Sequence, residues 1–156
     1  MVKVFIMRGL PGAGKTTWIR NNLPDAFICS ADNYFLDKEG NYKFDNLLIS
    51  EAHESCLKCF AEILTSHEDE AEKESLVIVV DNTAIRAWEI SPYYNLAKAY
   101  GHDVKVVHIK CDSDLAHSRN IHEVPLERVE KMDEGLNSET LPLFWNVEVV
   151  EPVSDH

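Results

Sequence analysis

The stretch Gly9-Leu10-Pro11-Gly12-Ala13-Gly14-Lys15-Thr16 decides the fold of this chain of 156 residues. It matches the pattern G-x-x-x-x-G-K-S/T at every fixed position, and average residue frequencies make a chance match in such a chain an event of about one in a hundred or rarer. Apolar residues 2–7 precede it and predict a buried strand, and a helix is expected from residue 15 to about residue 23, before Pro24. A phosphate-binding loop, or P-loop, needs this place between a strand and a helix, so the context disfavours the alternative of an ordinary turn.

The residue types of the P-loop predict a site for ATP with Mg²⁺. Glycines allow backbone N–H groups to turn inward around phosphate oxygens, and the helix N-terminus adds partial positive charge. Lys15 is expected to reach the β- and γ-phosphates, and Thr16 to hold Mg²⁺ through its hydroxyl. The residues predicted to contact ATP from this loop are Gly9, Pro11, Gly12, Ala13, Gly14, Lys15, Thr16 and Thr17.

The rest of the chain predicts strands that alternate with helices. Further strands are expected at residues 27–30, 76–80, 104–109 and 145–150, and helices at residues 44–66, 91–100, 112–120 and 125–135, with a loop at 31–42. Ser91 and Pro92 are expected near a helix start, and Gly101 at a helix end. Such alternation requires crossover connections. We therefore predict a three-layer α/β fold of the P-loop NTPase and kinase type, as a single domain over residues 1–156, with a parallel central sheet.

Two carboxylates follow predicted strands. Asp81 ends the most apolar strand, where P-loop enzymes place an acid that meets the metal, its water shell or an acceptor-orienting residue. The alternative is that Asp81 caps the next loop with Asn82 and Thr83. Asp32 follows the second strand, and ligands of such sheets bind at the carboxyl ends of the strands. Asp32 could accept a hydroxyl proton there, or it could form a simple turn with Asn33.

The composition bounds the class of protein. Apolar residues make up 45% of the chain and charged residues 27%, which suffices for a buried core. No apolar run approaches the roughly 18 residues that cross a bilayer, and no small-residue cleavage site follows the first strand. Four cysteines without a secretory signal are expected to be reduced thiols. These features predict a cytoplasmic protein that makes no membrane contact.

The net charge of the whole chain is negative, whereas the segment around the P-loop is locally basic. The net charge of −12 repels polyanions and argues against coating of long nucleic acids, which requires many neutralised phosphates. Residues 1–25 nevertheless contain Lys3, Arg8, Lys15 and Arg20 against a single acid. A local basic pocket beside the P-loop is compatible with this pattern.

Two other clusters are interpreted as structural. The charged run at residues 67–75 has no apolar face and is read as a solvated turn or helix end. His53, Cys56 and Cys59 resemble a metal site by spacing, but all three fall on a predicted amphipathic helix and no second pair exists. Cysteine is a favoured core residue, so we interpret these side chains as structural and not as zinc ligands.

Longer motifs give the chain a family resemblance. After the P-loop come Trp18, Ser30-Ala31-Asp32-Asn33-Tyr34-Phe35, Val80-Asp81-Asn82-Thr83 with Trp88-Glu89, Leu96-Ala97-Lys98-Ala99-Tyr100-Gly101, and Arg119-Asn120-x-His122-x-Val124-Pro125-Leu126. In this order and spacing, up to about residue 133, the chain resembles the 5′-hydroxyl polynucleotide kinase family. That family includes the kinase domain of the phage-type enzyme and related domains of animal ubiquitin-ligase-binding proteins.

The resemblance implies a role for each matching residue. Lys15 and Thr16 match the residues that bind phosphate and Mg²⁺, and Asp32 matches the general base. Asp81, with Asn82 beside it, matches the acid that orients the acceptor. Arg119 matches the arginine of a helical lid, here at about residues 112–135, that grips the phosphates of ATP; by the same comparison Arg128 is an ordinary surface arginine. The expected acceptor is the 5′-hydroxyl of a DNA or RNA end.

The chain also departs from the family. Phe35 stands where the phage-type enzyme has an arginine that helps to bind the acceptor, and Glu123 stands where relatives often have glycine. Arg8, Arg20 and Arg86 are then the basic residues expected to contact acceptor phosphates. The acidic charge keeps two alternatives open: a kinase for a nucleoside or other small metabolite, and a binding module in which ATP orders the lid with little catalysis.

Overall fold

The computed structural model describes residues 2–66, 76–121 and 123–151. The charged run at 67–75 and His122 lie outside the described residues. The strands are β1 (Val2–Arg8), β2 (Phe27–Cys29), β3 (Leu76–Asp81), β4 (Asp103–Ile109) and β5 (Val147–Val150). The helices are α1 (Lys15–Asn22), α2 (Ile49–Ser66), α3 (Ala87–Ala99), α4 (Ser113–Arg119) and α5 (Leu126–Ser138), with short 3-10 turns at Ala31–Phe35 and Asn46–Leu48.

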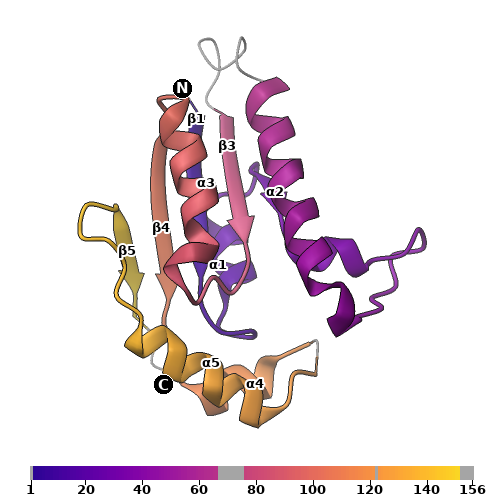
Figure 1. The fold of residues 1–156 in the computed structure, drawn as a ribbon. Helices are drawn as coiled ribbons and strands as arrows, with labels where there is room; N and C mark the ends of the chain where they lie inside the picture. Colours follow the sequence, from indigo (N-terminus) through magenta and orange to yellow (C-terminus); the bar gives the residue numbers. More distant parts are fainter. Residues whose placement is uncertain (1, 67–75, 122, 152–156) are drawn as a thin grey trace.

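The strands form one parallel sheet in the order β2-β3-β1-β4-β5. The predicted α/β fold with a parallel central sheet is therefore confirmed. β1 lies in the middle, and its residue Met7 pairs with Asp81 of β3. Because all strands run the same way, their carboxyl ends meet at one edge, which faces α4 and α5 (Figure 1).

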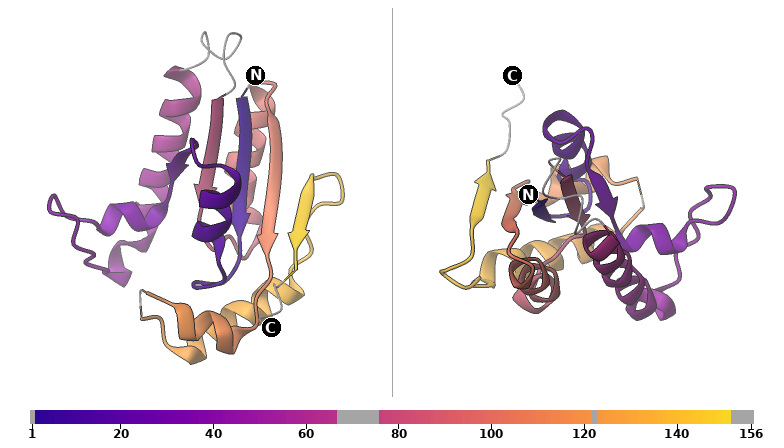
Figure 2. Two further views of the ribbon diagram at one scale, coloured as in Figure 1. Left: turned by 180° about the vertical axis from the view of Figure 1, so that it is seen from behind. Right: turned by 90° about the horizontal axis from the view of Figure 1, so that it is seen from above.

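Helices cover both faces of the sheet. Val4 and Ile6 of β1 are buried in one core cluster with Phe60 of α2 and Ile90 of α3. The opposite cluster joins Met7 of β1 to side chains of α1, α4 and α5, among them Ile19, Ala116 and Val129. Figure 2 shows α1 on the other side of the sheet from α2 and α3. The alternation of burial along β1 thus produces the three layers expected from the sequence.

Two predicted boundaries change because side chains cap local turns. The loop expected at 31–42 begins with the 3-10 turn Ala31–Phe35, where the hydroxyl of Ser30 accepts the Asp32 amide at 3.2 Å. The helix expected at 44–66 begins only at Ile49, after the 3-10 turn Asn46–Leu48. There the Asp45 carboxylate accepts the amide of Leu47 at 3.0 Å. Such local bonds compete with regular helix and are not visible in apolar periodicity.

The helix around residues 91–100 is present, but its start lies earlier than Ser91 and Pro92. α3 begins after Arg86, whose amide donates to the Glu89 carboxylate at 2.7 Å. Pro92 is inside the helix and Ser91 is not its cap. Gly101 closes the helix as predicted, with a φ of 77° and an amide that donates to the Lys98 carbonyl at 2.9 Å.

The cysteines on α2 differ in exposure. Cys56 is buried as expected, whereas Cys59 is exposed, and so is His53 on the same helix. Of the two cysteines on this helix, only Cys56 is therefore a core residue. None of the helices in the described part of the chain is long and apolar enough to span a membrane.

Candidate active site

The P-loop follows β1 and is fixed at both of its sides. The amide of Gly9 donates to the Thr83 carbonyl beyond β3 at 3.0 Å, which ties the loop to the neighbouring strand. Gly12 has a φ of 84°, and a Cβ at this position would collide with the Ala116 carbonyl of α4. Glycine is therefore required here for two reasons, its backbone conformation and the close approach of α4.

Lys15 points back into the loop. Its ammonium donates to the carbonyls of Gly9 and Leu10 at 2.7 Å and 3.0 Å. Burial lowers the pKa of Lys15 to about 8, and the nearby carboxylates of Asp81 and Asp32 oppose this shift. The bonds of the Lys15 ammonium described above are to carbonyls and not to a carboxylate, so an anion bound beside it would compensate its buried charge. Phosphate is the anion that this loop geometry fits.

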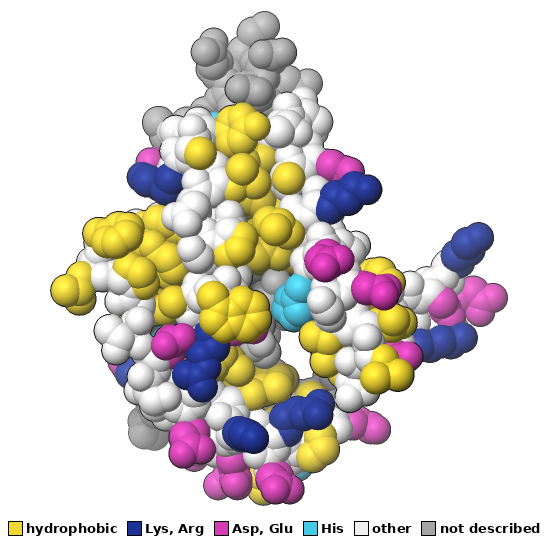
Figure 3. Space-filling view, in the orientation of Figure 1, with side chains coloured by type: hydrophobic (Ala, Val, Ile, Leu, Met, Phe, Trp, Pro, Cys, Tyr) yellow, Lys and Arg dark blue, Asp and Glu magenta, His cyan; other side chains and the backbone are white. Residues whose placement is uncertain are grey.

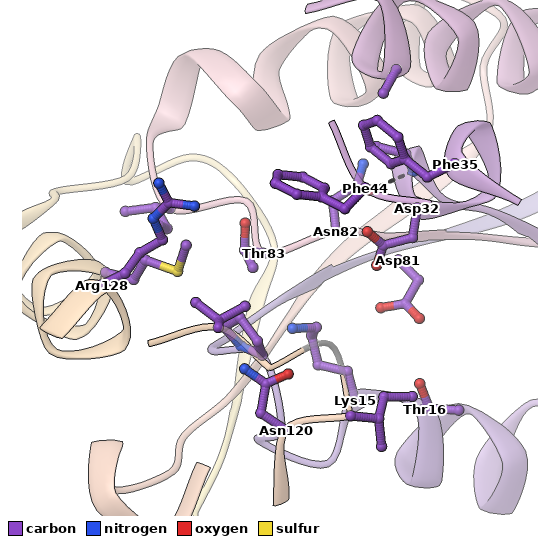
Figure 4. A pocket seen from close by; sticks show the side chains of 18 of the residues that line it. Lys15, Thr16, Asp32, Phe35, Phe44, Asp81, Asn82, Thr83, Asn120 and Arg128 are labelled. Atoms are coloured by element: carbon purple, nitrogen blue, oxygen red, sulfur yellow. Dashed lines mark hydrogen bonds between the residues drawn. The ribbon is translucent and has the colours of Figure 1, made fainter. Parts of the chain in front are cut away.

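Asp81 and Asp32 face the lysine from the ends of neighbouring strands (Figure 4). Burial raises the pKa of the Asp81 carboxyl, Lys15 lowers it, and Asp32 raises it further. Asp32 is exposed, and its Oδ1 accepts the Tyr42 hydroxyl at 3.3 Å. The carboxylate of Asp32 is therefore oriented by a hydrogen bond at an exposed position.

Asn82 holds the turn that carries Asp32 in place. Its Oδ1 accepts the amide of Ala31 at 2.9 Å, one residue before Asp32. Its Nδ2 donates to the Cys56 sulfur at 3.6 Å. The sequence predicted a substrate-orienting Asn82; the described bonds show that it joins the end of β3 to the turn that carries Asp32.

A cavity of about 810 Å³ brings the predicted site residues together at the carboxyl edge of the sheet. In Figure 3 it opens between the side that carries α2 and the layer of α4 and α5, with Lys and Arg side chains along its lower rim. Of the predicted site residues, those that line it are Pro11, Gly12, Gly14, Lys15, Thr16, Thr17, Asp32, Asp81, Asn82 and Arg119. Gly9 and Ala13 are not among the lining residues; the Ala13 amide donates to the Leu10 carbonyl at 3.0 Å within the loop.

The donor atoms beside the P-loop suit Mg²⁺. Thr16 offers a hydroxyl, and Asp32 and Asp81 offer carboxylates, to the same cavity. Oxygen ligands of this kind, few in number and next to bound phosphates, are what Mg²⁺ takes in phosphoryl-transfer sites. Among the described residues, no group of three or more His, Cys, Asp or Glu side chains could hold a metal ion by itself.

Arg119 is brought to the cavity by α4. It is the last residue of this helix, and it lines the cavity together with its neighbour Asn120. The predicted lid at about residues 112–135 corresponds to α4, α5 and their connection, which lie across the carboxyl edge of the sheet (Figure 1).

Arg8 was predicted to contact acceptor phosphates, but this prediction is wrong, because Arg8 does not line the cavity. Its buried guanidinium donates to the carbonyls of Ala84 at 2.9 Å, Ile85 at 2.7 Å and Leu136 at 3.4 Å. It also lies 3.3 Å from Nδ1 of His108, and burial lowers its pKa. Arg8 thus joins the end of β1 to the lid. Arg20 and Arg86 are exposed outside the cavity lining.

Among the lining residues that sequence reasoning missed, four are phenylalanine, tyrosine or arginine. Arg128 of α5, taken for an ordinary surface residue, is one, and the aromatic residues Phe35, Tyr42 and Phe44 are the others. Phe35 and Tyr42 fall in the segment expected to be a loop, and aromatic residues there were the available signal, because a loop has no core of its own to bury them. Phe44 was expected at the start of a helix, so no such signal existed for it. Nothing in the local sequence distinguishes Arg128 from the other arginines.

Comparisons with known proteins agree with this architecture. A family model described as AAA domain matches residues 4–134. NEDD4-binding protein 2 of Homo sapiens is 35% identical over an aligned length of 159 residues, and the match covers 95% of this chain and 8% of that protein. The chain therefore spans less than a tenth of the length of this curated relative.

Solved structures share the fold at low sequence identity. A sugar kinase from Janibacter sp. has a TM-score of 0.56 at 16% identity, over 97% of this chain and 85% of that one. A gluconokinase from Sinorhizobium meliloti has a TM-score of 0.57 at 15% identity, over 98% and 84%. A chain of the Pnkp1/Rnl/Hen1 RNA repair complex has a TM-score of 0.57 at 15% identity, over 86% and 44%.

Proposed function

This chain belongs to the AAA domain family, and on that premise we propose that it is an ATP-dependent kinase that phosphorylates a hydroxyl group, namely the 5′-hydroxyl of a DNA or RNA end. One observation carries the proposal: Lys15, Asp32, Asp81 and Arg119 line a single cavity at the carboxyl edge of the sheet. These are the charges that phosphoryl transfer needs, because catalysis of this reaction is mainly positioning and stabilisation of charge.

The proposed mechanism assigns one task to each side chain. The P-loop amides and Lys15 hold the phosphates of ATP, and Arg119 neutralises charge on the transferred group from the lid side. Asp32 accepts the proton of the acceptor hydroxyl at a carboxylate oxygen while that hydroxyl attacks the γ-phosphorus in line with the departing ADP. Thr16 and Asp81 would hold Mg²⁺, which, when bound, screens the negative charge of the phosphates.

A smaller acceptor is the second candidate. The net charge of −12 disfavours a long polyanion, and a sugar kinase and a gluconokinase share the fold over most of this chain. Under this alternative Asp32 keeps its task, and the acceptor is a nucleoside or a small metabolite with a hydroxyl group.

The test is transfer of labelled phosphate from γ-labelled ATP to a panel of acceptors. The panel contains 5′-hydroxyl DNA and RNA oligonucleotides, free nucleosides, gluconate and a mixture without acceptor. We expect the oligonucleotides to have the highest kcat/KM, because contacts beyond the first sugar add binding energy in the transition state. A nucleoside or gluconate with the highest value would move the assignment to the second candidate, and hydrolysis or no turnover in all mixtures would favour an ATP-dependent binding module.

Asp32→Asn tests the mechanism with little change in shape. Loss of a general base lowers rates by about 10²- to 10⁴-fold, while ATP affinity should stay within a few-fold. Asp25→Asn, at an exposed carboxylate outside the cavity lining, is the matched control and should keep full activity. Equal turnover in Asp32→Asn and Asp25→Asn would show that the proton goes elsewhere.

A further inference from the structure

Three aromatic side chains form a wall of the cavity, which we call the aromatic wall: Phe35, Tyr42 and Phe44. The ring of Phe44 lies 5.1 Å from that of Phe35, and 6.4 Å from that of Tyr42 in a stacked arrangement. Phe35 is buried at 7% exposure, whereas Phe44 is 48% exposed. The inner two rings therefore support an outer ring whose surface is available to a ligand.

The segment that carries the aromatic wall is held by its own backbone. Leu36 and Tyr42 form an antiparallel bridge, and the Lys43 amide donates to the Phe35 carbonyl at 2.8 Å. At the tip, the Asp37 carboxylate accepts the amides of Glu39 and Asn41, each at 2.9 Å. These bonds fix the spacing between the rings before any ligand arrives, which lowers the entropic cost of binding to them.

The aromatic wall is connected to the proposed general base. The Tyr42 hydroxyl donates to Asp32 Oδ1 at 3.3 Å, so one ring of the wall also orients the carboxylate. A planar group stacked on Phe44 consequently has Asp32 close to its edge. A hydroxyl carried by such a group would be presented to the carboxylate that is proposed to take its proton.

Arg128 supplies a cation on the other side of the cavity. It extends from α5, and in the view of Figure 4 the ring of Phe44 lies between Asp32 and Arg128. Two ion pairs lie within the described part of the chain, Lys43 with Asp37 and Lys105 with Glu148, and Arg128 takes part in neither. Glu89 also lines the cavity, but its carboxylate accepts the Arg86 amide at 2.7 Å. Since Lys15 and Arg119 serve the phosphates of ATP, Arg128 remains for an anionic group of the acceptor.

From these positions we infer that the aromatic wall and Arg128 form the acceptor subsite and determine its specificity, taking an aromatic base on Phe44 and a phosphate at Arg128. The inference rests on the proposed kinase function and adds the residues that choose the acceptor. Stacking recognises the face that every base presents, so the subsite selects a base-bearing acceptor without reading its sequence. An apolar ring at Phe44 has no hydrogen bond to offer a bare sugar, which therefore loses this contact.

The experiment pairs each side chain with the acceptor group that it is inferred to bind. The acceptors are adenosine 3′-monophosphate, adenosine, which lacks the phosphate, and an abasic tetrahydrofuran analogue of the monophosphate, which lacks the base. The variants are Phe44→Ala, Phe44→Trp, Arg128→Ala and the control Arg20→Ala, an exposed arginine outside the cavity lining. Acceptor affinity is measured by calorimetry with a non-hydrolysable ATP analogue in the donor site, and kcat/KM is measured with ATP.

The expected pattern is selective. Phe44→Ala should reduce the preference for the monophosphate over its abasic analogue by about 10-fold or more, and Phe44→Trp should preserve that preference. Arg128→Ala should reduce the preference for the monophosphate over adenosine by a similar factor. Arg20→Ala should change neither ratio.

Two results would overturn the inference. One is an equal loss for all three acceptors in Phe44→Ala or Arg128→Ala, which would indicate a general structural role. The other is an unchanged ratio in either variant. If adenosine 3′-monophosphate binds with the selective pattern but no acceptor is phosphorylated, the proposed kinase function fails while the subsite stands.

Discussion

At the residue scale, Lys15 shows how the P-loop positions a buried cation. Its ammonium is buried against the carbonyls of Gly9 and Leu10, and burial lowers its pKa to about 8. These two contacts replace water only in part, so the charge contributes little to the stability of the fold. Its value lies in the binding of phosphate.

We therefore expect Lys15→Ala to leave the Tm of the protein without nucleotide almost unchanged and to abolish the stabilisation by Mg-ATP. At a ligand concentration about 100 times Kd, that stabilisation amounts to about 2.7 kcal/mol in the intact protein. Thermal unfolding with and without Mg-ATP measures both quantities. Lys98→Ala, on the exposed side of α3, is the control that should keep the full shift. A normal shift in Lys15→Ala would contradict the assignment of the P-loop.

The sequence predicted residues well where chemistry depends on local backbone. Lys15, Thr16 and Asp32 follow from a loop motif and a strand end, and all three line the cavity. Arg8 was expected to contact the acceptor but is buried, whereas Arg128 was expected at the surface but lines the cavity. Tertiary packing alone decides which arginine is buried and which faces the cavity. Arg8 is 3% exposed and bonded to backbone carbonyls, and no pattern of neighbouring residues encodes that outcome.

At the element scale, the connection between α4 and α5 contains a residue in an unfavourable backbone conformation. Glu123 has a φ of 55°, and the left-handed region costs an ordinary L-residue about 1–2 kcal/mol. Glycine has no such cost, which gives a physical reason for the glycine of family relatives at this position.

Glu123→Gly should therefore keep the free energy of unfolding or raise it by up to about 1 kcal/mol. Glu130→Gly is the matched control, at an exposed position within α5, and should lower the free energy of unfolding by about 1 kcal/mol. Urea denaturation of the three proteins provides the comparison. A loss in Glu123→Gly as large as that in Glu130→Gly would mean that Glu123 contributes a contact that offsets its strain.

Strands and helices were predicted in the correct order because apolar periodicity reports the burial that forms them. The continuous apolar stretch of residues 76–80 forms most of β3, an inner strand of the sheet paired with β1 and β2. Helix starts were predicted less well, because each start is set by a single local hydrogen bond. These bonds lie at Ser30, Asp45 and Arg86. Several side chains can cap a turn in any loop, and the sequence does not say which one does.

At the scale of the whole molecule, charge limits how the protein can hold a nucleic acid. The net charge is −12, and beyond the cations proposed for ATP the cavity offers Arg128 for an acceptor phosphate. Affinity for a 5′-hydroxyl oligonucleotide should therefore fall with salt at a log–log slope of about −1 to −2, and Arg128→Ala should make that slope shallower by about 1. Binding titrations over a series of NaCl concentrations test this. A slope steeper than about −4 would indicate a long basic track that the structure does not describe.

Arg8 and His108 join two neighbouring strands of the sheet to α5. Arg8 ends β1, its in-register partner His108 lies on β4, and the guanidinium bonds the Leu136 carbonyl of α5. His108 is 8% exposed, and burial, with Arg8 and then other cations, lowers its pKa to about 4. A neutral ring accepts a hydrogen bond from the Arg8 guanidinium at Nδ1, whereas a protonated ring would repel the buried guanidinium.

This pair predicts how stability depends on pH. The unfolded chain protonates His108 near pH 6.5 and the folded protein only near pH 4, so the unfolded state binds more protons between these values. Neutral His108 therefore adds to the free energy of unfolding above about pH 6.5. This stabilisation is lost as pH falls, and the loss reaches about 3 kcal/mol at pH 4. In His108→Gln the amide oxygen still accepts from Arg8 but does not titrate, so the free energy of unfolding of this variant should decline less between pH 6.5 and pH 4 than that of the unchanged protein. Parallel curves for the two proteins in urea titrations over this range would show that His108 is protonated equally in the folded and unfolded states.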